Sequence, residues 1–299
     1  MTSTILIDAS SVPPAPQPPT RPTRDTLAVR PQTFGGVFRS ERIKFTSLLS
    51  IRLTLLITML LGLGVSLLVV LMQVKEQFIV GGSGALFGAG DQAMQSYLLF
   101  AATLSAPFLA LVFGVLGVFA ISNEYSSGMI LSTLTAVPRR GRMFAAKALL
   151  LATASALTAA VIVFGALGIA LLGVPEAASQ VFTVPVLSGV LGAIAYLVLI
   201  SLFAFGVAAL LRSTAGGIAV VAGVTFVLQI VFQVMSMTGW EWVNVAANYL
   251  PTPLGGVLSM GLTEASAEPS YWTALIAMVV WAAVTLIPAA MLFQRRDAR

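Results

Sequence analysis

Six long runs of mostly apolar residues, none with an Asp, Glu, Lys or Arg inside it, dominate this sequence. About 20 such residues in an α-helix cross the hydrocarbon core of a bilayer. The sequence therefore predicts an all-α integral membrane protein with six transmembrane helices. The predicted spans are about residues 53–74, 96–122, 146–172, 184–211, 214–237 and 270–293, with Lys147 at the edge of the third.

Composition supports a membrane protein and narrows its chemistry. Only 9% of the 299 residues are charged, and 58% are hydrophobic, whereas a soluble domain has about 25% charged residues. The chain contains no cysteine and no histidine, which removes disulfides, thiolate catalysis and the usual ligands of zinc and haem. We expect no metal and no cofactor to be bound by this chain.

The positions of lysine and arginine predict the orientation of the spans. Fifteen of the 16 basic residues fall before the first span, between spans two and three, between spans four and five, or after span six. Basic residues are enriched in cytoplasmic loops, so both termini are predicted to be cytoplasmic. The net charge of +5 is explained by this topology, and we expect no nucleic-acid partner.

Two segments precede the first span. Residues 1–32 are rich in proline and are predicted to be a disordered cytoplasmic tail. Residues 33–52 mix apolar side chains with Arg39, Glu41, Arg42 and Lys44, which suits an amphipathic helix in the membrane interface. Such a helix serves either as a simple membrane anchor or as a docking surface, and the sequence leaves both open.

The predicted spans lack the groups that power an ion-coupled carrier. Such carriers use ionisable side chains or broken helices near the middle of the bilayer, and the charges here bracket the spans instead. We therefore expect the energy to come from a partner. Gln229 and Gln233 share one face of span five and either line a pathway or bond to a neighbouring helix.

The loop between spans two and three concentrates polar residues in the stretch NEYSSGMILSTLTAVPRRGRMFAAK, residues 123–147. Apolar residues at near-helical spacing predict a short amphipathic helix, which Pro138 ends because proline disfavours helix at and before its own position. A basic elbow that ends at Lys147 then leads into span three. An ordinary positively charged inner loop is the simpler interpretation.

This loop resembles the characteristic cytoplasmic loop of type 2 ABC transporter permeases. The family pattern is a Glu followed by an aromatic residue, a Gly, a short apolar helix, a Pro and an Arg-rich elbow that ends at a Lys. The matching residues are Glu124, Tyr125, Gly128, Leu134, Pro138, Arg140, Arg142 and Lys147. RSERIKFTSLLSIR at 39–52 and NYLPTPLGGVL at 248–258 are similar to two further family segments.

The resemblance implies the membrane subunit of an exporter of the type V fold, located in a bacterial plasma membrane. Such a subunit pairs with a second permease, identical or paralogous, and with two copies of a separate ATPase that holds ATP and Mg²⁺. This chain has no GxxxxGK[ST] motif, so the chain itself is not expected to be an enzyme. Its cargo is expected to be hydrophobic or amphipathic.

The resemblance also assigns roles to residues. Residues 124–137 would form the cytoplasmic coupling helix that contacts the ATPase, and residues 239–270 would include a re-entrant external hairpin. The implied coupling residues are Glu124, Tyr125, Gly128, Leu134, Pro138, Arg139, Arg140 and Arg142. Tyr249, Leu250 and Pro251 are the expected outer gate, and an external amphipathic loop is the alternative.

Two other functions stay open from the sequence. A non-transport membrane anchor or sensor subunit would use the tail and the basic loop to localise cytoplasmic partners. A secondary carrier is less compatible with the sequence, because the spans contain no midplane charge.

Overall fold

The computed structural model describes the chain in five stretches, residues 33–47, 49–76, 78–126, 140–262 and 268–295. Within these stretches the regular structure is entirely helical, with one 3₁₀ helix (η2) and one π-helical turn (η3) among the α-helices. Residues from Phe34 onward belong to one compact unit. The predicted tail, residues 1–32, lies outside the described residues.

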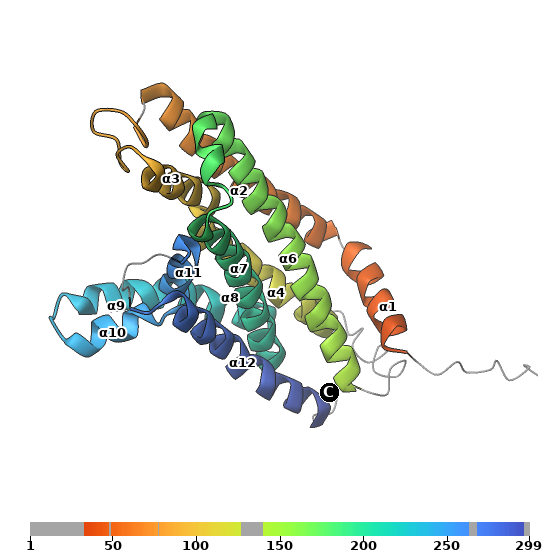
Figure 1. Ribbon diagram of the computed structural model, residues 1–299. Helices are drawn as coiled ribbons and strands as arrows, with labels where there is room; N and C mark the ends of the chain where they lie inside the picture. Colours follow the sequence, from red (N-terminus) through yellow and green to blue (C-terminus); the bar gives the residue numbers. More distant parts are fainter. Residues whose placement is uncertain (1–32, 48, 77, 127–139, 263–267, 296–299) are drawn as a thin grey trace, which may run out of the picture. The chain divides into compact units, whose positions relative to one another are not determined.

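The helices are labelled in Figure 1 in chain order. They are α1 (Phe34–Ser47), α2 (Leu49–Glu76), α3 (Asp91–Thr103), α4 (Ala106–Ser126), α6 (Arg140–Gly173), η2 (Pro175–Gln180), α7 (Val184–Leu211), α8 (Thr214–Ala222), η3 (Gly223–Val227), α9 (Leu228–Ser236), α10 (Glu241–Asn248), α11 (Pro251–Met260) and α12 (Tyr271–Arg295).

Among the described residues, six helical segments are long and apolar enough to cross a membrane, which agrees with the predicted number of spans and is consistent with a multi-pass membrane protein. The segments are Leu49–Val74, Asp91–Ser122, Gly141–Gly173, Val184–Leu211, Thr214–Ser236 and Tyr271–Gln294. The fourth has the predicted limits. The second and third begin about one turn before the predicted starts at 96 and 146, because polar residues such as Asp91 and Arg142 extend the helices beyond the apolar runs.

The N-terminal helix is shorter than the predicted 33–52 interfacial segment. α1 ends at Ser47 and α2 begins at Leu49, so residues 49–52 belong to the helix of the first span. The Arg52 side chain turns back and donates a hydrogen bond from Nε to the carbonyl of Thr46. A charged residue at this position is therefore accommodated inside the helix and does not delay its start.

Two spans contain irregular backbone. The second is divided into α3 and α4 at residues 104–105, directly before Pro107, which has no N–H and fits best in the first turn of a helix. The fifth is interrupted by the π-helical turn η3 between α8 and α9. The sequence indicates the first interruption through Pro107, but it carries no comparable signal for the second.

The most enclosed helix is α7, which packs against α4, α6, α11 and α12 (Figure 1). Glycines permit these approaches, as is typical of helices packed in membranes. A Cβ atom at Gly117 of α4 would lie 2.1 Å from the carbonyl oxygen of Ser201 in α7. A Cβ atom at Gly192 of α7 would lie 2.2 Å from the carbonyl oxygen of Leu258 in α11.

The two ends of the packed helices differ, and we name each after an element that marks it. At the α1 end, α1 packs against α6 and α2 where these helices begin, and α7 and α12 finish beside the start of α6. At the η2 end, α6 finishes and α3 and α7 begin around η2. Each end has its own cluster of buried apolar side chains, the larger at the α1 end and through the middle.

Candidate functional site

The buried face of α1 combines apolar side chains with one carboxylate. Val37, Glu41 and Phe45 are four residues apart, so they lie along one face of the helix, and all three are buried. This face packs against α6. A carboxylate in the middle of an apolar stripe must find a cation, because an isolated buried charge is costly.

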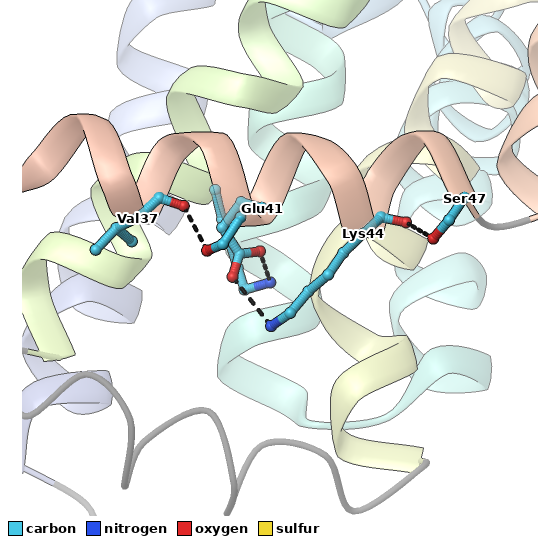
Figure 2. Close-up of polar contacts among 6 residues, drawn as sticks. Val37, Glu41, Lys44 and Ser47 are labelled. Atoms are coloured by element: carbon cyan, nitrogen blue, oxygen red, sulfur yellow. Dashed lines mark hydrogen bonds and ion pairs between the residues drawn. The ribbon is translucent and has the colours of Figure 1, made fainter. Parts of the chain in front are cut away.

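The cation comes from α6. The Lys147 ammonium contacts Oε2 of Glu41, and Nζ of Lys44 lies 3.3 Å from the other carboxylate oxygen, Oε1 (Figure 2). The side chains of Glu41 and Lys147 are 4% and 5% exposed, whereas that of Lys44 is 40% exposed. The carboxylate thus contacts two cations. One is buried on α6, which is distant in the sequence, and the other is half-exposed on α1 itself.

Local hydrogen bonds define the end of α1 beside this ion pair. The Ser47 hydroxyl donates to the carbonyl of Lys44 over 2.9 Å, and the Ser40 hydroxyl donates to the carbonyl of Val37 over 2.8 Å (Figure 2). The carbonyls in the last turn of a helix have no partner within it. Ser47 and Arg52 satisfy two of them, at Lys44 and Thr46.

Aromatic packing surrounds the first turns of α6. The ring of Phe144 lies 5.1 Å from that of Phe205 in α7 and 5.6 Å from that of Phe293 in α12, measured between centroids. Met143 is also fully buried. The start of α6 is therefore held by α1 through charge and by α7 and α12 through apolar contact.

The predicted coupling residues lie on both sides of a gap in the described chain. The backbones of Glu124 and Tyr125 belong to the last turn of α4, and that of Arg140 begins α6. Arg142 is exposed in the first turn of α6. Gly128, Leu134, Pro138 and Arg139 lie outside the described residues, as does most of the predicted coupling helix at 124–137.

The interfacial residues divide between two faces of α1. Glu41 and the half-buried Lys44 face the ion pair, whereas Arg39 and Arg42 are exposed. The link between Glu41 and Lys147, which are 106 residues apart, was not predicted from the sequence, where Lys147 was identified only as the end of the basic elbow. The signal was present in Glu41 itself, since an acid aligned with Val37 and Phe45 falls on the buried face.

The two glutamines of the candidate pathway lie in α9 and differ in environment. The side-chain oxygen Oε1 of Gln229 is buried and has no hydrogen-bond partner among the described residues. Gln233 is exposed. The structure therefore brings one amide toward the protein interior and leaves the other on the surface.

The expected gate residues form the junction between α10 and α11. The carbonyl of Tyr249 accepts a hydrogen bond from Nε1 of Trp281 over 2.9 Å. Leu250 is buried, and Pro251 is the first residue of α11. Trp281 is the eleventh residue of α12, so with a rise of 1.5 Å per residue the junction lies about 15 Å along that helix from its first residue.

Further contacts place α11 deep among the spans. The Thr252 hydroxyl donates to the carbonyl of Thr225 over 2.7 Å, and Thr225 lies within the π-helical turn of span five. A Cβ atom at Gly255 would lie 2.6 Å from the ring of Tyr196, which is fully buried near the middle of α7. The α11 helix is thus fitted against the central parts of two spans.

Comparison with known proteins gives no assignment for this site. No family model matches the sequence, and no curated protein is significantly similar to it. Among the described residues, no three Asp or Glu side chains gather into a cluster that could hold a metal ion. The candidate site at the α1 end is therefore characterised by its ion pair and its position in the first turns of α6.

Proposed function

We propose that this protein is the membrane subunit of an ATP-binding cassette exporter in a bacterial plasma membrane, with both termini cytoplasmic. A separate ATPase, present in two copies and holding ATP and Mg²⁺, would supply the energy. A second permease subunit, identical or paralogous, would complete the membrane part. The proposed cargo is hydrophobic or amphipathic.

The observation that carries this proposal is the ion pair between Glu41 and Lys147. It joins α1 to α6, the helix that follows the loop whose sequence resembles a coupling loop. A cytoplasmic partner that moves this loop would therefore move α1 and α6 together. Coupling of this kind requires that the partner contact two states of the membrane subunit differently.

The proposed mechanism continues from the start of α6 into the packed helices. Phe144 contacts α7 and α12, so a displacement of α6 is transmitted to helices that also hold α11. We propose that α10 and α11 form the re-entrant hairpin, with Tyr249, Leu250 and Pro251 at its inner turn. The buried amide oxygen of Gln229 offers an acceptor along the proposed pathway.

The test is to purify the full chain together with its candidate ATPase and to measure complex formation and ATP turnover. Glu124→Ala and Arg140→Ala should each reduce complex formation or turnover, because they alter the proposed contact with the ATPase. Gln92→Ala, an exposed substitution at the η2 end, is the matched control and should change neither. The proposal fails if no ATPase copurifies, or if both variants behave like the wild type.

A further inference from the structure

The face of α1 that points away from the ion pair carries two arginines. Arg39 and Arg42 are exposed and lie one turn apart, and Ile43 beside them is 59% exposed. At 3.6 residues per turn, Arg39 and Ile43 lie on the side of the helix opposite Glu41, and Arg42 lies about 100° from Glu41 around the axis. The exposed surface of α1 is therefore cationic, with an apolar side chain beside the arginines.

This face is fixed close to the first span. α1 ends at Ser47, and the spanning helix α2 begins at Leu49, which is 69% exposed. Arg42 lies five residues before the end of α1, about 7.5 Å along the helix, and α2 starts two residues after that end. Both arginines are therefore held within reach of the polar headgroup layer, while Ile43 and Leu49 can enter the apolar layer below it.

The local charge balance favours an anion at this face. Glu41 is the one acidic residue of α1, and its carboxylate is already occupied by Lys147 and Lys44. The two arginines, the two lysines and Glu41 together carry a net charge of +3. Within the described part of the chain, neither Arg39 nor Arg42 forms an ion pair.

We propose that the exposed face of α1 binds the headgroups of anionic phospholipids, with the guanidinium groups of Arg39 and Arg42 on lipid phosphates. Arginine suits this role because its planar fork can donate two hydrogen bonds to one phosphate. The buried ion pair holds α1 in the rotation that presents these arginines. The proposal requires a membrane-embedded chain and does not depend on an ATPase partner.

The experiment measures thermal unfolding of the full chain in detergent by tryptophan fluorescence. Phosphatidylglycerol or phosphatidylcholine is added to the micelles, and the difference between their effects on Tm is the readout for each variant. The wild type should be stabilised by several degrees more by phosphatidylglycerol, and this difference should shrink in 0.5 M NaCl because salt screens exposed charges. Arg39→Gln/Arg42→Gln should abolish the difference.

A conservative variant and a soluble anion sharpen the test. Arg39→Lys/Arg42→Lys keeps the charge and should retain part of the difference, whereas glycerol phosphate at the same concentration should produce no shift. A lower Tm of any variant in detergent alone does not affect the readout, which compares two lipids on the same variant.

Three results would overturn the proposal. The first is an equal response of the wild type to the two lipids, and the second is a full phosphatidylglycerol response in Arg39→Gln/Arg42→Gln. The third is a shift of the same size with glycerol phosphate, which would assign the site to free anions. If the glutamine variant instead keeps its lipid response and loses a copurifying ATPase, the face belongs to a protein partner.

Discussion

The α1 end and the η2 end of the packed helices are held together by different interactions. At the α1 end, a buried ion pair between Glu41 and Lys147 joins two helices. At the η2 end, the described contacts use uncharged groups: the Tyr97 hydroxyl donates to the carbonyl of Ala170 over 2.9 Å, and Gln95 donates to Gln180 over 2.8 Å.

The difference matters because a buried ion pair and a neutral hydrogen bond lose different amounts of stability when one partner is replaced. A buried ion pair contributes little net stability when intact but is strongly destabilising when one partner is removed. A neutral hydrogen bond contributes about 0.5–1.5 kcal/mol. The α1 end is therefore the region where a small electrostatic change has the larger structural effect, as the proposed transmission of energy requires.

The largest expected effect is that of Lys147→Met, which leaves Glu41 buried opposite an apolar side chain. Loss of one partner of a buried pair costs about 3–5 kcal/mol, and Lys44 keeps the effect near the lower value. Thermal unfolding in detergent should show a clearly lowered Tm. The double variant Glu41→Leu/Lys147→Met removes both charges and should recover most of the loss; if it is as unstable as the single variant, unpaired charge is not the cause.

Close packing of α7 on α11 should give the next largest effect. Gly192→Val adds a side chain whose Cβ atom would lie 2.2 Å from the backbone carbonyl oxygen of Leu258. The backbone cannot rotate aside as a side chain can. We expect a loss of about 3 kcal/mol, at the upper end of the usual range for overpacking.

Gly168→Val in α6 is the matched control for Gly192→Val, because a Cβ atom at Gly168 has nothing within 4 Å. The measurement is the Tm of the two variants side by side. Equal Tm values would contradict the described fit of α11 against α7.

At the η2 end, Gln73→Leu should cost less than loss of the ion pair. The Gln73 side chain accepts hydrogen bonds from the backbone N–H groups of Ile79 and Val80 and donates to the carbonyl of Val80. Removing it leaves buried backbone groups without partners, which costs about 2 kcal/mol. Gln92→Leu, at an exposed position nearby, should leave the Tm unchanged, and a Gln73→Leu variant as stable as this control would be the contrary result.

The smallest effect is expected from Lys44→Gln. Its contact with Glu41 is 3.3 Å long and its side chain is 40% exposed, so solvent screens the interaction and the loss should stay below about 1 kcal/mol. A Tm decrease as large as that of Lys147→Met would contradict this ranking, because it would mean that Lys44 stabilises Glu41 as much as the buried Lys147 does.

The parts of the structure that follow from local sequence could be predicted. The six spans are visible as uncharged apolar runs. The helical state of residues 34–47 follows from their amphipathic pattern, although the sequence did not separate α1 from α2 at residue 48.

The parts that depend on contacts between distant segments could not be predicted. Nothing in the residues near Lys147 indicates that Glu41 faces it across 106 positions. Likewise, the glycines of α7 indicate close packing but not that Gly192 meets α11. The π-helical turn at Gly223–Val227 has no local signature, and its Thr225 carbonyl accepts a hydrogen bond from Thr252 of α11.

We propose that the ion pair between α1 and α6 transmits movement between a cytoplasmic ATPase and the spans. The most direct measurement is a charge exchange in the purified complex, with ATP turnover recorded for Glu41→Lys, Lys147→Glu and the two together. We predict that each single variant lowers turnover and that the double variant, which restores the pair in reverse, recovers most of it. Wild-type turnover in both single variants would contradict the claim.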